Sequence, residues 1–365
     1  MNVVVRETVA AQRLKIVDCD IHPTYRTPAE LNPFLPARWR EHMATYGPYF
    51  RHGLASQLPF PRMMAAGMRV DSFPKDGPPG SSLELMRTQH LDTNGVEIGM
   101  LIALSRGGLE ERNLEFAAAL ASAVNDWQVE CWVKPEPRLR AAVVVPQEHV
   151  EFSVAEIERR ADDPAYTQIM ISPRSSDPLG HRRYWPIYAA VEASGKPLAL
   201  HLAGYSGGHS STGTGWPTYY MQEHFAMSSG MQNTLASLVF EGVFERFPKL
   251  KVVMIEGGFA WAPALCWRMD NHWERQRGET PHVKRPPSEY VRQHFWFTTQ
   301  PIEEPDNPEH LADIMNWIGW DRLMISTDYP HWDFDDPRQA FKFRLSDEQR
   351  RKVFGANAKE LYGLP

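Results

Sequence analysis

Short runs of almost entirely apolar residues recur along the chain, separated by longer segments with a different pattern. Apolar runs of this length without polar alternation predict strands that are buried on both faces, as in a parallel sheet. The eight predicted strands are residues 14–22, 96–104, 139–146, 167–173, 197–204, 251–258, 295–300 and 322–329.

The segments between these strands predict helices, because their apolar residues recur three and four positions apart. Gly195, Pro248 and Gly319 stand where three of them end, as helix-terminating residues do. Eight alternating strand and helix units in one chain predict a single (β/α)₈ TIM barrel rather than two domains. The clearest predicted helices are residues 113–133, 154–161, 184–195, 231–247, 262–275 and 308–319, and residues 345–364 predict a closing pair of helices with a break at 355–357.

Two segments fall outside this repeat. Residues 23–81 are rich in Pro, Gly, Met, Arg and aromatic residues, and residues 205–225 are rich in Gly, Ser, Thr and aromatic residues. Both follow a predicted strand, so both are expected over the carboxyl-terminal mouth of the barrel, where loops of this fold build sites. We interpret them as lid-like insertions, with solvated loops as the alternative. The predicted organisation is an N-terminal extension, residues 1–13, followed by a barrel domain, residues 14–365.

Composition narrows the class of protein. The hydrophobic share of 42% provides a substantial core, and 39 basic against 45 acidic residues, mixed along the chain, leave no basic block for nucleic acid. The first residues lack the apolar stretch of a secretory signal, and no segment has the apolar length of a membrane span. Three cysteines, Cys19, Cys131 and Cys266, predict neither a disulfide framework nor a thiolate zinc cluster. We therefore expect a cytoplasmic protein that binds neither nucleic acid nor membrane.

Polar residues with metal-binding side chains stand where several of the apolar strands end. Asp20 and His22 end the first strand and, being two residues apart, share one face of it. His201 ends the fifth strand and Asp328 the eighth. Two imidazoles with two carboxylates suit Zn²⁺ or Mn²⁺ better than Mg²⁺ or Ca²⁺. Each residue alone has a structural alternative, such as a hydrogen-bonded pair or a turn residue, but their shared position predicts one divalent-metal site.

Further polar and aromatic residues lie near the same strand ends. Glu256 follows the sixth strand, and with Asp328 it is a candidate catalytic carboxylate. His331, His224, Tyr205 and Trp261 are candidate substrate-binding residues, with surface polarity and aromatic packing as their alternatives. These side chains predict a small organic substrate that contains a ring.

The order Asp-x-His, His and Asp after strands one, five and eight resembles the amidohydrolase superfamily, specifically the branch of aminocarboxymuconate semialdehyde decarboxylase. The resemblance covers residues 14 to 363. It is clearest in two sequence segments, FERFPKLKVVMIEGG and MISTDYPHWDF. It implies a distorted (β/α)₈ barrel with one Zn²⁺ or Mn²⁺ held by Asp20, His22, His201 and Asp328. It also implies that Asp328 doubles as a proton acceptor, and it favours a homodimer.

The chain departs from the resemblance at two positions. Many relatives have His or Glu where Asp20 stands, and a carboxylate there makes the site slightly better suited to Mn²⁺. Relatives usually have a histidine at the position of Glu256. This glutamate is a candidate base for a metal-bound water, a candidate added ligand, or an acceptor that orients a histidine ligand. A structural carboxylate beneath the Gly-Gly turn is the remaining interpretation.

Three functions follow from these observations. Hydrolysis of an amide or lactone carbonyl by a metal-activated water is preferred, with Glu256 or Asp328 as proton acceptor. Non-oxidative decarboxylation of an aromatic or dienoic acid is the alternative, which the missing histidine weakens. A catalytically inactive binding or scaffold barrel is the third, and retention of every ligand type argues against it.

Overall fold

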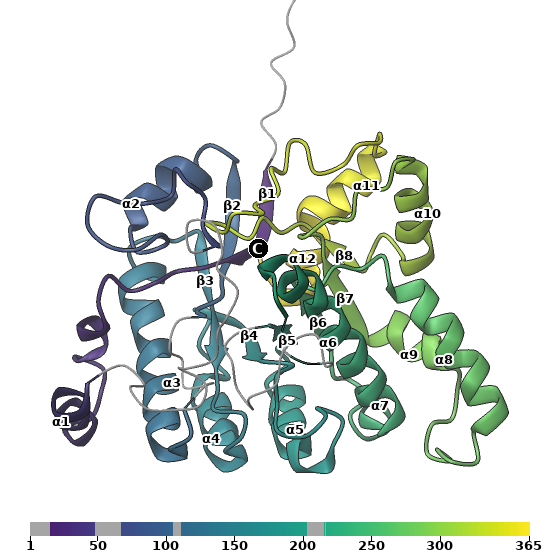
Figure 1. Cartoon of the computed structure of the whole chain (residues 1–365), viewed down its shortest axis with the longest axis horizontal. Helices are drawn as coiled ribbons and strands as arrows, with labels where there is room; N and C mark the ends of the chain where they lie inside the picture. Colours follow the sequence, from purple (N-terminus) through teal and green to yellow (C-terminus); the bar gives the residue numbers. More distant parts are fainter. Residues whose placement is uncertain (1–14, 48–66, 105–110, 203–214, 216) are drawn as a thin grey trace, which may run out of the picture.

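A computed structural model describes residues 15–47, 67–104, 111–202, 215 and 217–365. Eight parallel strands form one sheet in chain order, and helices surround it (Figure 1). All eight predicted strands are confirmed, and so is the (β/α)₈ architecture. The strands are β1 (Ile16–Ile21), β2 (Val96–Leu101), β3 (Leu139–Val144), β4 (Tyr166–Ile171), β5 (Leu198–His201), β6 (Val252–Ile255), β7 (Phe295–Thr298) and β8 (Leu323–Met324).

Burial on both faces accounts for the apolar pattern of the strands. Every residue of β1, β4, β5, β6, β7 and β8 is buried. In β2 and β3 the second residue alone is partly exposed. Strands in such a position need side chains that fill both the barrel interior and the layer beneath the helices, so a continuous apolar run is the expected signature.

The barrel closes between β1 and the segment that follows β8. The backbone N–H of Asp328 donates to the carbonyl of Asp20 at 3.1 Å, and the N–H of His22 donates to the carbonyl of Tyr329 at 2.8 Å. The two segments that carry candidate ligands are therefore joined directly by their main chains.

The regular part of the eighth strand is shorter than the predicted range, residues 322–329. The reason is that side chains take the backbone donors that a regular ladder would use. The N–H of Ser326 donates to the hydroxyl of Thr299, and the N–H of Thr327 donates to the carboxylate of Asp18. Local hydrogen bonds of this kind compete with sheet pairing and distort this side of the barrel.

All six helices predicted between the strands are confirmed. Gly195 and Gly319 end two of them with positive φ angles of 70° and 103°. The closing segment is also helical, but the break predicted at residues 355–357 is wrong, because a π-helical turn at Lys352–Ala356 joins its two helices without interruption. No helix in the described part of the chain is long and apolar enough to cross a membrane. The helices are α1 (Ala37–Tyr46), α2 (Leu83–Met86), α3 (Leu114–Gln128), α4 (Val150–Arg160), α5 (Trp185–Ser194), α6 (Tyr220–Phe240), α7 (Val243–Arg246), α8 (Ala262–Gln276), α9 (Pro287–His294), α10 (Pro308–Ile318), α11 (Asp347–Arg351) and α12 (Asn357–Tyr362).

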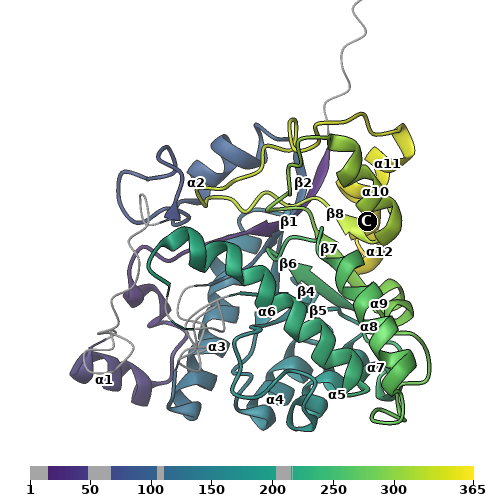
Figure 2. The same ribbon diagram turned by 45° about the vertical axis from the view of Figure 1, so that its right-hand side comes forward.

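The sequence pattern missed α1, α2, α9 and the first half of α6. Helix α6 begins at Tyr220, within the predicted insertion 205–225, and it packs against α7, α8 and α9 (Figure 2). The side chain of Gln222 accepts hydrogen bonds from the N–H groups of Thr218 and Tyr219, which caps the start of the helix. Residues 205–214 and Trp216 of this insertion lie outside the described residues.

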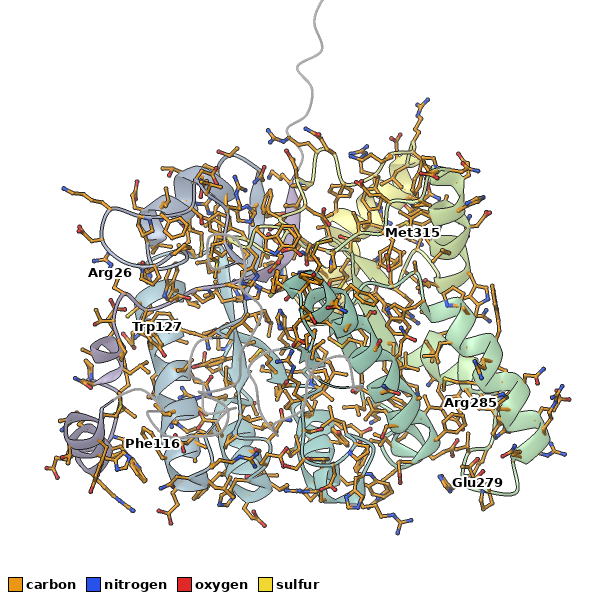
Figure 3. All side chains as sticks on the ribbon, viewed as in Figure 1. Arg26, Phe116, Trp127, Glu279, Arg285 and Met315 are labelled. Atoms are coloured by element: carbon orange, nitrogen blue, oxygen red, sulfur yellow. The ribbon has the colours of Figure 1, made fainter. Side chains whose placement is uncertain are left out.

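The described parts of the first insertion, residues 23–81, contact two regions of the barrel. Trp39 of α1 stacks on Phe116 of α3 at 4.9 Å between ring centroids, on the flank where Figure 3 labels Phe116. Further along, Met68 forms a backbone bridge with His331, beyond β8. The insertion therefore reaches the carboxyl-terminal mouth, and its role as a lid stays a prediction.

Candidate metal centre

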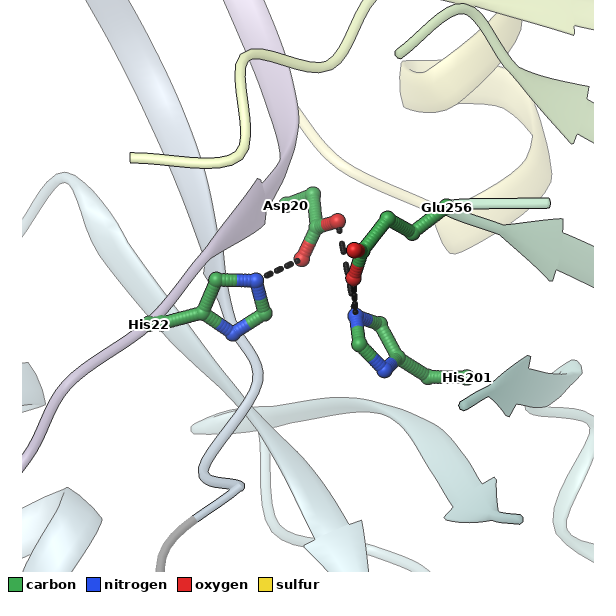
Figure 4. A group of neighbouring side chains, drawn as sticks. All are labelled: Asp20, His22, His201 and Glu256. Atoms are coloured by element: carbon green, nitrogen blue, oxygen red, sulfur yellow. Dashed lines mark ion pairs between the residues drawn. The ribbon is translucent and has the colours of Figure 1, made fainter. Parts of the chain in front are cut away.

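The carboxyl ends of four segments bring five of the predicted side chains together. Asp20 and His22 come from β1 and the position just after it, His201 ends β5, Glu256 directly follows β6, and Asp328 follows β8. All five are buried, with Glu256 the most exposed at 6%. Potential ligand atoms of the first four lie within 4.8 Å of one another (Figure 4).

The Nε2 atom of each of the two histidines, His22 and His201, faces two carboxylates. Nε2 of His22 lies 2.7 Å from Asp328 Oδ1 and 3.1 Å from Asp20 Oδ1. Nε2 of His201 lies 2.8 Å from Glu256 Oε2 and 3.6 Å from Asp20 Oδ2. A ring nitrogen carries at most one hydrogen, so it cannot serve two acceptors equally.

Hydrogen bonding within the described residues leaves this cluster unsatisfied. Both carboxylate oxygens of Asp20, Nε2 of His22 and both ring nitrogens of His201 are buried without a hydrogen bond of regular geometry. Buried polar atoms are rarely left in this condition unless an ion or ligand completes them. Nitrogen and oxygen donors that converge on one point fit a Zn²⁺ or Mn²⁺ ion.

The electrostatics of the cluster favour a cation. Burial disfavours the charged form of His201, but Asp20 and Glu256 outweigh it and raise the pKa of His201 to about 9. The carboxylates of Asp20 and Asp328 likewise raise the pKa of His22 well above its ordinary value against the effect of burial. Despite its own burial, Asp20 has a pKa well below the usual range because of His22 and His201. A bound divalent ion would replace these protons as the counter-charge.

The orientation of His22 is fixed from outside the cluster. Its Nδ1 lies 2.9 Å from the carbonyl oxygen of Ile102, which follows β2. Because that carbonyl can only accept, Nδ1 donates and Nε2 is left as the basic nitrogen that faces the carboxylates. Histidine ligands of metals are commonly held in this way.

The backbone is strained at two of the five residues. Glu256 and Asp328 have φ angles of 55° and 62°, and they are the non-glycine residues with positive φ in the described part of the chain. Such a conformation costs on the order of 1–3 kcal/mol and persists where the surrounding structure enforces it. Here it occurs in the segments that follow β6 and β8, from which both carboxylates face the centre.

Two site residues, Gln300 and Asp333, were not predicted. Nε2 of Gln300 donates to Asp328 Oδ2 at 3.1 Å and to Asp333 Oδ2 at 2.9 Å. Gln300 follows β7, and the polar run Thr-Thr-Gln at the end of an apolar strand was a signal of the same kind as the others. Asp333 had no such signal, because it lies in a loop beyond the strand.

The predicted substrate-binding residues have different surroundings. His331 Nδ1 lies 2.5 Å from Asp328 Oδ1, and His224 Nε2 lies 3.0 Å from Asp333 Oδ2, so both adjoin the centre. Trp261 instead donates its indole N–H to the carbonyl of Gly257 at 2.9 Å. Tyr205 lies outside the described residues.

The amidohydrolase family model matches residues 17–364, nearly the whole chain. The chain belongs to the amidohydrolase family. The resemblance inferred from the strand-end residues is thereby confirmed, and the chain is an enzyme of this family rather than an inactive barrel.

Curated relatives of this amidohydrolase include two kinds of decarboxylase. A gamma-resorcylate decarboxylase of Polaromonas sp. (strain JS666 / ATCC BAA-500) is 26% identical over 294 residues, which cover 76% of this chain and 86% of the relative. A 2-amino-3-carboxymuconate-6-semialdehyde decarboxylase of Dictyostelium discoideum is 24% identical over 286 residues, which cover 76% of each chain.

Solved structures share the fold of this amidohydrolase at lower identity. A 5-carboxyvanillate decarboxylase from Sphingomonas paucimobilis has a TM-score of 0.69 at 20% identity and covers 96% of this chain and 100% of its own. A dihydroxybenzoic acid decarboxylase from Polaromonas sp. JS666, with bound manganese and the inhibitor 2-nitroresorcinol, has a TM-score of 0.64 at 20% identity, covering 96% and 97%. The manganese in that relative agrees with the expected ion, Zn²⁺ or Mn²⁺.

These comparisons contradict hydrolysis as the preferred reaction, because the curated relatives are decarboxylases. The preference rested on carboxylates near a metal-activated water. Both reactions use a metal with a nearby proton-carrying carboxylate, so that feature does not discriminate between them. The alternative expectation, non-oxidative decarboxylation, is the one that the relatives support.

Proposed function

We propose that this amidohydrolase is a metal-dependent carboxy-lyase that decarboxylates a small aromatic or dienoic acid without oxidation. The observation that carries the proposal is the buried cluster of Asp20, His22 and His201, whose polar atoms are unsatisfied, with Asp328 2.7 Å from His22, in a chain whose curated relatives include decarboxylases.

We assign Asp20, His22, His201 and Asp328 as the metal ligands. Glu256 is assigned as an added ligand, because its Oε2 approaches the same nitrogen of His201 that faces Asp20. An acceptor that merely oriented the ring would contact the other nitrogen, Nδ1. When bound, the ion supplies positive charge that holds the substrate carboxylate and a neighbouring oxygen and stabilises charge that develops during the reaction.

Asp328 is proposed to move the proton that the reaction needs. The proton adds to the substrate carbon that bears the carboxylate. The bond from that carbon to the carboxylate then breaks, its electron pair restores the conjugated system, and CO₂ leaves. His331, 2.5 Å from Asp328 Oδ1, is positioned to return a proton to Asp328. This arrangement supplies a proton carrier without the histidine that relatives have at the position of Glu256.

An aromatic group beside the centre supports a planar substrate. The rings of His224 and Trp332 meet edge to face at 5.4 Å, and Tyr220 lies 6.4 Å from Trp332. Flat aromatic edges and faces of this kind bind conjugated rings well. We assign His224 and His331 as residues of the substrate pocket, while Tyr205 and Trp261 stay predictions.

The remaining predictions from the sequence extend this proposal. We also expect the enzyme to be cytoplasmic and to bind neither nucleic acid nor membrane, because of its charge pattern and its apolar content. A homodimer through α8 follows from the tryptophans on that helix, of which Trp267 is 58% exposed. Light scattering of the wild type and of Trp267→Lys tests the dimer.

The test of the proposed function is CO₂ release by the manganese-loaded protein. Hydroxybenzoic acids and dienoic dicarboxylic acids labelled with ¹³C at the carboxylate are the substrates, and NMR detects labelled CO₂ and bicarbonate. In D₂O the product should carry one deuterium at the carbon that lost the carboxylate. Asp328→Asn should abolish both signals. If the wild type carries one metal ion per chain and releases no label from any acid, the proposal is wrong.

A further inference from the structure

A second buried polar group lies next to the proposed ligands without belonging to them. It consists of Asp18, His90 and Thr327, each with no exposed surface. Asp18 precedes Asp20 by two residues on β1, and Thr327 directly precedes Asp328. The group therefore joins the two segments that carry two of the proposed carboxylate ligands.

The carboxylate of Asp18 accepts four hydrogen bonds. Oδ1 accepts from the N–H of Asp20 at 3.2 Å and from the N–H of Thr327 at 3.0 Å. Oδ2 accepts from the hydroxyl of Thr327 at 2.6 Å, and Nε2 of His90 lies 2.7 Å from it. A buried carboxylate with this many donors is well satisfied and held in one orientation.

The ring of His90 has a defined role in this group. Its Nδ1 lies 3.0 Å from the side-chain amide nitrogen of Asn94, which can only donate, so Nε2 carries the hydrogen that Asp18 accepts. The ring also stacks on Tyr329 at 4.8 Å with 5° between the planes. His90 thus contacts the residue after Asp328 as well as Asp18.

These contacts hold Asp328 from both sides. Thr327 before it is bound to Asp18 through main chain and side chain, and Tyr329 after it is packed on His90. Asp328 itself has the strained φ of 62° and donates its N–H to the carbonyl of Asp20. A strained conformation needs such support from its surroundings.

We propose that Asp18, with Thr327 and His90, positions the metal centre by fixing the separation of Asp20 and Asp328. Among the described residues, the side chains whose ligand atoms converge at the metal centre include none of these three, so they act through the ligands rather than on the ion. The proposal rests on the ligand assignment made under the proposed function, but not on the substrate or the reaction.

The test measures Mn²⁺ affinity on the full chain after its metal has been removed, by isothermal titration calorimetry. Thr327→Val keeps the shape of the side chain and removes the hydroxyl donor, whereas Thr327→Ser retains that donor. Loss of partners that hold metal ligands weakens affinity by roughly 10- to 100-fold, so Thr327→Val should show this loss and Thr327→Ser should bind close to wild type. Asp18→Asn should show a loss as well.

The matched control is Thr167→Val. Thr167 is also buried in a strand, but its hydroxyl contacts Met100 and does not contact the metal centre. The control should bind Mn²⁺ like the wild type. Circular dichroism and urea unfolding establish that each variant is folded at the titration temperature. If Thr327→Val does not fold, His90→Gln and His90→Leu form the second pair, because the glutamine retains a donor for Asp18.

Wild-type affinity in folded Thr327→Val, or an equal loss in the valine and serine variants, would overturn the proposal. So would a wild-type protein that binds no Mn²⁺. Weakened binding in the valine variant, together with absence of decarboxylation by the metal-loaded wild type, would overturn the proposed reaction and leave the positioning role supported. The reverse outcome, an active wild type and unaltered affinity in both pairs, would overturn the positioning role alone.

Discussion

Glu256 Oε2 lies 2.8 Å from Nε2 of His201, the nitrogen that also faces Asp20. This contact separates the roles that the sequence left open for Glu256. A structural carboxylate would bond to the turn beneath it, and an orienting acceptor would contact Nδ1. The contact with Nε2 therefore supports the proposed role of Glu256 as an added metal ligand.

The first prediction follows from that contact. Glu256→Gln removes one negative charge from the centre, so we expect Mn²⁺ affinity to fall, and CO₂ release to fall with it. Glu303→Gln is the matched control, because Glu303 is a partly buried carboxylate that accepts from the N–H groups of Phe259 and Ala260 in the same region. Titration calorimetry of both variants is the measurement. Equal affinities in Glu256→Gln and the wild type would return Glu256 to a structural role.

The second prediction concerns the proposed ligands His201 and Asp328. His201→Ala deletes a donor from a mononuclear site and Asp328→Asn replaces a charged donor with a neutral amide, so each should remove most of the bound metal, and the circular dichroism spectrum should stay near native. His294→Ala is the control, because this buried histidine is bonded to the carbonyl of Leu250 and lies outside the cluster. Metal content per chain is measured by inductively coupled plasma mass spectrometry. Full metal content in either ligand variant would refute its assignment.

Much of the fold was predictable because the barrel imposes a simple pattern on its strands. Burial on both faces forces continuous apolar runs, and these mark all eight strands. Regular pairing of the eighth strand was overestimated, because Asp18 and Thr299 take two of its backbone donors, and no local pattern reveals such distant partners. Helix α9 has only eight residues, and its short amphipathic pattern was not recognised.

The candidate site was predictable to the extent that its residues end strands. Asp20, His22, His201, Glu256 and Asp328 all do so, and the structure brings them together. Gln300 ends β7 in the same way and was overlooked. Neither Asp18 nor His90 was recognisable, because each contributes through contacts with residues far away in the sequence. The reaction was misjudged because one ligand set supports both hydrolysis and decarboxylation.

A third prediction concerns stability and pH. Burial, with the nearby carboxylates of Asp333, Glu304 and Asp328, raises the pKa of Asp335 to about 7 from an ordinary value of 3.8, although the N–H of Ile302 opposes this. The folded state therefore keeps Asp335 protonated where the unfolded chain has already lost that proton. Its contribution to stability is full below about pH 4 and is lost as the pH rises through about 7.

Asp335→Asn tests this effect, because its amide oxygen still accepts from Ile302 and carries no charge at any pH. We expect the free energy of unfolding of the variant to increase relative to that of the wild type as the pH rises from about 4 to 8. Urea unfolding of the metal-free proteins across that range measures the difference. A difference that does not change with pH would show that Asp335 ionises in the folded protein as it does in the unfolded chain.

The last prediction concerns Gln300, whose Nε2 bridges the carboxylates of Asp328 and Asp333 at 3.1 and 2.9 Å. A hydrogen bond to a charged group contributes about 1.5–3 kcal/mol, which corresponds to roughly a 10- to 100-fold change in rate if the bond supports the reacting geometry. Gln300→Leu keeps much of the side-chain volume and removes the amide, so kcat for decarboxylation should fall by that factor.

Gln300→Glu should be worse, because it brings a third carboxylate toward Asp328 and Asp333 without a donor between them. The metal content of both variants shows whether a lower kcat comes from impaired proton transfer by Asp328 or from loss of the metal ion. We expect Gln300→Leu to retain its metal, because Gln300 contacts Asp328 through Oδ2, whereas His22 faces Oδ1. A Gln300→Leu enzyme with wild-type kcat would show that the other contacts of Asp328 position it without Gln300.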